Sequence, residues 1–123
     1  MNISKILIVD DEETISSYLD RKLTQLGYTV LVASDGEEAV ELCNSQKPDI
    51  VLLDVKLPRM NGYEVCRRIK SNPKTCNVPV LMLSAKSQAN EIEEGLAAGA
   101  ERYITKPIGF PDILNHIKSF ETA

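Results

Sequence analysis

Residues 5–12 read Lys-Ile-Leu-Ile-Val-Asp-Asp-Glu, a short apolar run that ends abruptly in three carboxylates. Four consecutive apolar residues predict a β-strand that is buried on both faces, as the strands of parallel sheets are. The pattern recurs at residues 49–54, where Ile-Val-Leu-Leu is followed by Asp54. The two stretches together predict a parallel sheet with acidic side chains along one edge.

The rest of the chain alternates between apolar runs and helical periodicity. We expect strands at residues 5–9, 29–33, 49–53, 78–83 and 101–105, and helices at about 13–26, 35–46, 62–72, 87–98 and 110–117. Strands that alternate with helices imply right-handed crossovers and a parallel sheet covered on both faces. We therefore predict an α/β fold, a flavodoxin-like doubly wound five-stranded sheet of order 2-1-3-4-5 with five helices, forming a single domain over residues 1–123.

Helical spacing also predicts which side chains face the core. Ile15, Leu19, Leu23 and Leu26 share one face of the first helix, and Gly27 ends that helix. In the fourth helix the same spacing predicts that the apolar side chains of residues 92 and 96, an isoleucine and a leucine, point inward.

Composition narrows the class of protein. The 123 residues are 43% hydrophobic and 26% charged, with a net charge of −4, so we expect no direct contact with nucleic acid. No apolar run is long enough for a membrane span, and no signal peptide is visible, so we expect a cytoplasmic protein with no membrane partner. Three cysteines without Cys-x-x-Cys spacing suggest neither a disulfide framework nor a zinc site.

Polar residues follow four of the predicted strands. The first ends at Asp10 and Asp11, the third at Asp54, the fourth at Ser84 and the fifth at Lys106. Carboxyl ends of parallel strands share one edge, and ligands bind where the strand order reverses, here between the first and third strands. Three neighbouring carboxylates repel one another, and Mg²⁺ with oxygen ligands is the simple remedy.

These residues also have the chemistry of an aspartyl-phosphate site. Asp54 offers a carboxylate nucleophile, Lys106 a cation and Ser84 a hydroxyl donor, beside the metal. Each residue alone would be explained more simply as a helix cap, a turn residue or a solvated side chain. Four complementary groups at four strand ends make a coincidence a poor explanation.

Six segments carry a resemblance to a known family: Ile8–Glu12, Asp49–Asp54, Leu57–Gly62, Pro79–Ala85, Gly99–Ala100 and Tyr103–Pro107. Across nearly its whole length the chain resembles the receiver domain of two-component response regulators, and it is similar to chemotaxis regulators of that family. The resemblance implies that Asp54 is the phosphoacceptor. It also implies that Asp11 and Asp54 ligate Mg²⁺ directly, Asp10 through a water molecule, and Lys56 through its backbone carbonyl.

The resemblance assigns further roles around the phosphoryl group. Lys106 would pair with that group, and Ser84 would hydrogen-bond to it. Tyr103 would be the aromatic switch residue, filling the space that Ser84 leaves when it moves. The bond between Lys106 and Pro107 would be a cis peptide bond.

The implied function is a phosphorylation-dependent signalling switch in a two-component system. The domain would not be an enzyme acting on a small-molecule substrate, and would catalyse only its own phosphorylation and dephosphorylation. A histidine kinase, a phosphotransfer protein or a small acyl phosphate would be the donor. The fourth helix, fifth strand and fifth helix would form the face for an output domain or effector protein, and for a homodimer that forms on phosphorylation.

Two lysines near the predicted site support a separate hypothesis. Lys56 follows Asp54 by two residues, and Lys86 follows Ser84 by two. We expect both side chains to point toward the mouth of the site, attract anions and obstruct the hydrolytic water, so that the phosphorylated state lasts longer. The alternative is that both are ordinary solvated lysines.

Three other functions compete with this interpretation. A haloacid-dehalogenase-like phosphatase typically carries Asp-x-Asp at the nucleophile, but Lys56 stands at the second position. A nucleotide-binding module would need a glycine-rich first turn, whereas residues 10–14 are acidic and would repel phosphates. An unphosphorylated scaffold of the same fold usually lacks a pocket carboxylate or the lysine, and this chain keeps them all.

Overall fold

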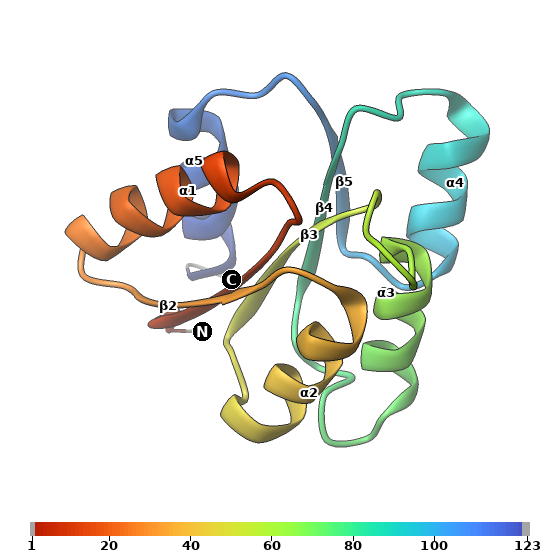
Figure 1. Ribbon diagram of the computed structural model, residues 1–123, viewed down its shortest axis with the longest axis horizontal. Coiled ribbons are helices and arrows are strands. Elements are labelled where there is room, and N and C mark those ends of the chain that lie inside the picture. Colours follow the sequence, from red (N-terminus) through yellow and green to blue (C-terminus); the bar gives the residue numbers. More distant parts are fainter. Residues whose placement is uncertain (1, 122–123) are drawn as a thin grey trace.

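The computed structural model describes residues 2–121 and consists of a central parallel sheet with helices on both faces (Figure 1). The strands are β1 (Lys5–Val9), β2 (Thr29–Ala33), β3 (Ile50–Asp54), β4 (Val80–Ser84) and β5 (Arg102–Thr105). The helices are α1 (Glu13–Gln25), α2 (Gly36–Gln46), α3 (Gly62–Ser71), α4 (Ala89–Ala97) and α5 (Phe110–Glu121).

The strand order is β2-β1-β3-β4-β5, and every neighbouring pair is parallel, which confirms the predicted flavodoxin-like topology. Val9 is paired with Leu53, and Ser84 is paired with Thr105. This register keeps the carboxyl ends of β1, β3, β4 and β5 nearly level. The polar residues that follow these strands therefore emerge at one edge of the sheet.

Side-chain alternation along the strands builds two apolar layers. Leu7, Val51 and Met82 belong to the cluster that includes residues of α2 and α3, whereas Ile6 and Leu81 belong to the cluster that includes residues of α1 and α5. Figure 1 shows the matching arrangement, with α1 and α5 on one face of the sheet and α2, α3 and α4 on the other. Residues Ile6–Val9 of β1 and the whole of β3 are buried, as predicted for strands covered on both sides.

Two predicted core positions are wrong. Leu26 is 54% exposed because α1 ends at Gln25 and Gly27, with a φ of +97°, turns the chain away. Leu96 is 47% exposed, and it is its neighbour Gly95 that is buried in α4. Helical spacing predicted a stripe of apolar residues in each case, but the edge of that stripe lies outside the packed interface.

Three strands begin later than their apolar runs suggested. β3 starts at Ile50, β4 at Val80 and β5 at Arg102. Before β4, the segment 72–78 forms successive turns, in which the Thr75 amide donates to the Asn72 carbonyl at 3.0 Å. The buried Thr75 hydroxyl also donates to the Ile69 carbonyl at 2.7 Å, which fastens the turn to the end of α3.

The amino-terminal edge of the sheet is held by satisfied polar groups. Oδ2 of Asp49 accepts hydrogen bonds from the amides of Ser4 and Lys5, each at 2.9 Å, and from the Ser4 hydroxyl at 3.2 Å. Nearby in the fold, Lys70 Nζ donates to the carbonyls of Cys76 and Val78, and contacts Glu101 at 2.8 Å. None of the described helices is both long enough and apolar enough to cross a membrane.

Candidate functional site

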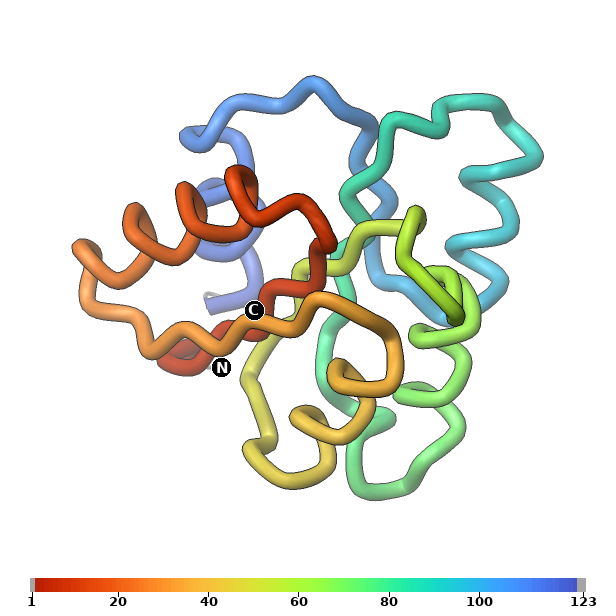
Figure 2. Tube along the Cα trace, viewed as in Figure 1, coloured from red at the N-terminus to blue at the C-terminus, as the bar shows by residue number. Residues whose placement is uncertain are grey.

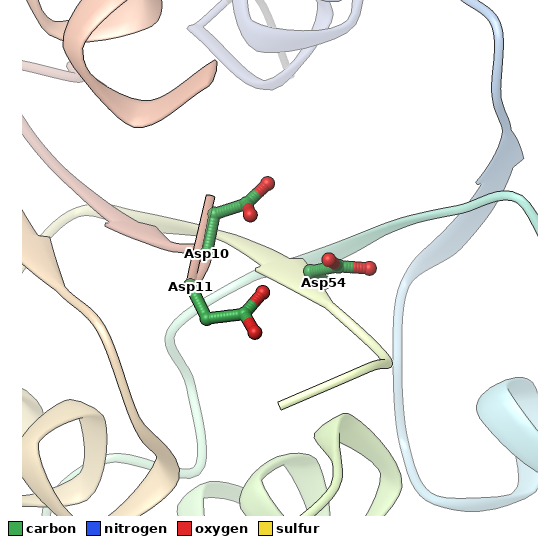
Figure 3. A group of neighbouring side chains, drawn as sticks. All are labelled: Asp10, Asp11 and Asp54. Atoms are coloured by element: carbon green, nitrogen blue, oxygen red, sulfur yellow. The ribbon is translucent and has the colours of Figure 1, made fainter. Parts of the chain in front are cut away.

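Three carboxylates meet where β1 and β3 end. Asp10, Asp11 and Asp54 each offer an oxygen, and these oxygens all lie within 4.8 Å of one another. Figure 3 shows Asp10 and Asp11 on the segment after β1, beside Asp54 on β3. Asp10 and Asp54 are buried, at 6% and 8% exposure, while Asp11 is exposed. The structure thus brings together the three carboxylates that were predicted to hold the metal.

Backbone contacts fix the orientation of the two buried carboxylates. Asp10 Oδ1 accepts from the Glu12 amide at 2.9 Å, and Asp54 Oδ1 accepts from the Val55 amide at 2.8 Å. The loop after β3 folds back, so that the Gly62 amide donates to the Val55 carbonyl at 2.8 Å. A side chain at Gly62 would collide with the Asp54 carbonyl oxygen, so this close approach needs glycine.

Lys106 brings a positive charge to the same edge. Its Nζ lies 3.5 Å from Asp10 Oδ2 and 3.8 Å from Asp54 Oδ2. Its backbone amide donates to the Ser84 carbonyl at 2.7 Å, so the end of β5 is fastened to the end of β4; Figure 2 allows the two chain segments to be followed side by side. The bond between Lys106 and Pro107 is cis.

The environment of Asp54 opposes its negative charge. Burial raises the pKa of this carboxyl above its ordinary value, and the charge of Asp10 raises it further. Lys106 and the amides of Lys56 and Val55 lower the pKa but do not offset the burial. An ionised Asp54 would therefore be favoured by an additional cation at the site.

A cavity of about 620 Å³ opens over these residues. Asp11, Asp54, Ser84 and Lys106 line it, together with the two lysines singled out in the sequence, at positions 56 and 86. A second, more apolar cavity of about 650 Å³ lies alongside, between α1 and α5, and shares Asp54 and Lys106 with the first. Asp54 can thus be reached by a group of phosphoryl size.

The predicted switch residues are connected through one loop residue. The Lys86 amide donates to Ser84 Oγ at 3.1 Å, and the Tyr103 hydroxyl donates to the Lys86 carbonyl at 2.8 Å. Ser84 is buried within the site, whereas Tyr103 lies outside the cavity on β5. The backbone of Lys86 therefore makes a direct physical link between the two side chains.

Gly95 is a residue that the sequence reasoning missed. A Cβ at this position would collide with the Tyr103 ring and would come within 2.9 Å of Met82 Sδ. The ring therefore occupies space that only glycine leaves open. A glycine inside a predicted helix costs about 1 kcal/mol relative to alanine, and that unexplained cost was the available signal.

Tyr63 of α3 is a neighbour of Tyr103. Its hydroxyl donates to the Glu91 carbonyl at 3.2 Å. Burial raises the pKa of Tyr63 well above its ordinary value, and the neighbouring Tyr103 hydroxyl contributes in the same direction. The Tyr103 ring is thus bordered by α3, α4 and the loop before α4.

Comparison with known proteins points in one direction. Residues 6–118 match the family model described as the response regulator receiver domain. The chain is 42% identical over 115 residues to the alkaline phosphatase synthesis transcriptional regulatory protein PhoP of Bacillus subtilis (strain 168). That alignment covers 94% of this chain but 47% of the relative, so the chain spans about half the length of that curated protein.

Solved structures agree with this match. The chemotaxis protein CheY4 of Vibrio cholerae has a TM-score of 0.89 and 29% identity, covering 95% of this chain and 98% of that protein. The receiver domain of a sensor histidine kinase from Pseudomonas aeruginosa PAO1 has a TM-score of 0.89 and 28% identity, with all of both chains covered. That second structure contains a magnesium ion coordinated in its active site cleft.

Proposed function

The chain belongs to the family of response regulator receiver domains, and from this premise we propose that it is a signalling switch in which Asp54 accepts a phosphoryl group. One observation carries the proposal: a buried, cavity-lining Asp54 belongs to a cluster of three carboxylates and lies 3.8 Å from the Lys106 ammonium. The family is one of signalling domains, which leaves the phosphatase and nucleotide-binding alternatives without support.

Mg²⁺ would be held by groups that fit its preference for oxygen ligands. Asp11 and Asp54 would bind it directly, Asp10 through a water molecule, and Lys56 through its backbone carbonyl. The bound ion would neutralise the carboxylates and the oxygens of the transferring phosphoryl group. The raised pKa of Asp54 supports this proposal, because burial and the Asp10 charge disfavour the ionised carboxylate and Lys106 alone does not offset them.

The reaction would be a displacement at phosphorus. An oxygen of the Asp54 carboxylate attacks, the P–O(Asp54) bond forms, and the bond from phosphorus to the donor breaks. The electron pair leaves with the histidine nitrogen when the donor is a phosphorylated kinase or phosphotransfer protein, and with the carboxylate oxygen when the donor is an acyl phosphate. Lys106, within 4 Å of both buried carboxylates, would pair with the phosphoryl oxygens.

The change of state would pass from Ser84 to Tyr103. The phosphoryl group brings roughly 1.5 to 2 negative charges and new acceptor oxygens, to which the Ser84 hydroxyl would donate. Because Lys86 bonds to both Ser84 and Tyr103, a shift of one would be felt by the other. The output domain, effector or second copy would then bind the α4–β5–α5 face, where Leu96 is already exposed.

Lys56 and Lys86 would prolong the phosphorylated state by obstructing the hydrolytic water. Both residues line the cavity over Asp54, which supports the hypothesis. We expect Lys56→Ala and Lys86→Ala each to shorten the half-life of the phosphorylated protein. An unchanged half-life in either variant would contradict the hypothesis and leave that residue as an ordinary solvated lysine.

Intact mass spectrometry tests the proposed function directly. The protein is incubated with acetyl phosphate, with and without Mg²⁺, and its mass is compared with that of Asp54→Asn treated identically. We expect one added phosphoryl group on the wild type with Mg²⁺ only, and none on the variant. Asp11→Asn, which retains Asp54, separates loss of the acceptor from loss of the metal site. A phosphoryl group added to Asp54→Asn at the wild-type rate would contradict the assignment.

A further inference from the structure

The Lys86 side chain lies between helix α4 and the cavity that opens over Asp54. The residue lines the cavity that contains Asp54, yet its Nζ is 3.7 Å from Glu91 Oε2 in the first turn of α4. The lysine side chain is 43% exposed and the glutamate side chain 24% exposed. The ammonium is therefore near two regions and has room to move between them.

Glu91 is the fixed member of this pair. Its other carboxylate oxygen, Oε1, accepts from the Gln88 amide at 3.1 Å, and its own amide donates to the Gln88 carbonyl at 3.0 Å. The first of these contacts is the Glu91 half of the capping box that begins α4, and the second is a backbone bond of the same turn. Lys86, in contrast, is fixed only through its backbone, which bonds to Ser84 and Tyr103.

Phosphorylation would change the balance of charge around this lysine. Before phosphorylation, Asp10 and Asp54 already have Lys106 as a cation. The added phosphoryl group would bring roughly 1.5 to 2 negative charges into the cavity that Lys86 lines. Two anions, the phosphoryl group and Glu91, would then compete for one ammonium.

We propose that Glu91 is a positioning residue that holds Lys86 away from phosphorylated Asp54 and thereby shortens the life of the phosphorylated state. This inference rests on the proposed function. When Lys86 pairs with Glu91, water can attack phosphorus, the P–O(Asp54) bond breaks with its electrons on the carboxylate, and inorganic phosphate leaves. When Lys86 pairs with the phosphoryl group, it covers that line of attack and leaves Glu91 as an unpaired charge on α4.

The competition is reciprocal by thermodynamic necessity. If Glu91 weakens the pairing of Lys86 with the phosphoryl group, the phosphoryl group weakens the pairing of Lys86 with Glu91 by the same factor. The first turn of α4 would thus respond to phosphorylation through the Lys86 side chain. This response would add to the one carried by the Lys86 backbone, which bonds to Ser84 and Tyr103.

The test uses Glu91→Gln in the full 123-residue chain. Glutamine at this helix position retains the capping box, so the substitution removes the charge and keeps the helix start. An exposed ion pair of this kind supports about a two- to fivefold effect, and we expect dephosphorylation to slow by that factor. The matched control is Glu93→Gln on the same helix, because Glu93 forms no ion pair among the described residues.

A double-mutant cycle with Lys86→Ala separates positioning from a structural role. Glu91→Gln should have no effect on dephosphorylation in the Lys86→Ala background. The ¹³Cε resonance of Lys86 should also move on addition of beryllofluoride and Mg²⁺ to the wild type. An unchanged resonance, a Glu91→Gln effect that persists without Lys86, or an equal effect of Glu93→Gln would each overturn the inference.

Failure of the proposed function is distinguishable. If the wild type gains no phosphoryl mass from acetyl phosphate, Asp54 is not an acceptor and the inference falls with it. If the wild type is phosphorylated but Glu91→Gln decays at the wild-type rate or faster, the inference alone is wrong. Thermal unfolding of every variant, matched to the wild type, verifies that folding is retained.

Discussion

Strand β3 is flanked by two aspartates, Asp49 immediately before it and Asp54 as its last residue, and their surroundings are opposite. One oxygen of Asp49 accepts three hydrogen bonds. Burial raises the pKa of Asp49, but the hydrogen bonds from Ser4 and Lys5 and the charge of Lys5 outweigh burial and lower it overall. For Asp54, burial outweighs the effect of Lys106 and of the backbone amides, so the pKa is raised.

The lysines at the two edges repeat the contrast. Lys70, at the amino-terminal edge, makes three contacts of 3.2 Å or less with oxygen acceptors. Lys106, at the carboxyl-terminal edge, has its two carboxylate partners at 3.5 and 3.8 Å. Polar groups at the amino-terminal edge of the sheet have close partners within the fold. Those at the carboxyl-terminal edge have more distant partners and can still bind a ligand.

The largest expected effect is on phosphorylation, through Asp11, the exposed member of the proposed metal site. Removing groups that merely orient a metal ligand costs about 10–100-fold in metal affinity, so Asp11→Ala should slow Mg²⁺-dependent phosphorylation by at least about tenfold. Its stability should change by no more than about 0.5 kcal/mol, because the residue is exposed. Rates by intact mass and urea unfolding check the two parts. A large loss of stability would show that this edge, too, holds the fold.

Asp49→Ala should produce the reverse result. It leaves the amides of Ser4 and Lys5 without their acceptor, so the free energy of unfolding should fall by about 1–3 kcal/mol. Urea denaturation measures this change. Asp49→Asn, which retains an acceptor oxygen, should cost less. Phosphorylation of Asp54 in Asp49→Ala should continue at the wild-type rate, and slowing of that rate would show that the two edges are coupled.

Asp54→Asn should stabilise the protein when Mg²⁺ is absent. The substitution removes a buried charge whose environment opposes it, so the melting temperature in EDTA should rise by about 2–4 °C. Differential scanning calorimetry in EDTA and in Mg²⁺ provides the comparison, since the ion should stabilise only the wild type appreciably. A melting temperature below that of the wild type in EDTA would mean that the Asp54 charge is compensated within the fold.

The smallest effect, and the sharpest test of the contrast, lies in the pH dependence. A raised pKa means that Asp54 favours folding only when protonated, so the advantage of Asp54→Asn should shrink as pH falls through that raised pKa, above about 3.9. A lowered pKa means that Asp49 favours folding when ionised, so its contribution should vanish only below about pH 3.9. Melting temperatures should be measured in EDTA from pH 7.5 down to pH 3. As the pH falls, the difference between Asp54→Asn and the wild type should close before the difference between Asp49→Ala and the wild type. The opposite order would reverse the assignment.

Much of the fold and site could be predicted because the apolar runs are short and uniform, and because polar residues of matching chemistry follow them directly. Buried strands such as β1 and β3 tolerate few polar residues, so Asp54 stands out at the end of its run. Parallel pairing then brings the strand ends together without further information. The acidic cluster follows from that topology alone.

Other features could not be predicted. They depend on which distant residue a side chain contacts, and on which side of a helix packs against the rest of the protein. Asp49 belonged to the predicted third strand, and only the structure shows it serving Ser4 and Lys5, more than forty positions away. Leu96 has the spacing of a core residue, but Tyr103 packs against Gly95 instead. The pairing of Lys86 with Glu91 depends on the course of a loop, for which the sequence has no periodic signal.

The glycine beneath Tyr103 has a consequence for how the domain could vary. A single methyl group at position 95 would clash with the Tyr103 ring, so either the ring or helix α4 would have to move. Relatives that carry alanine there would rest with the ring or the helix displaced, whether or not the phosphoacceptor aspartate is modified. One carbon atom would then set the resting position of the Tyr103 ring, and with it that of the proposed output face.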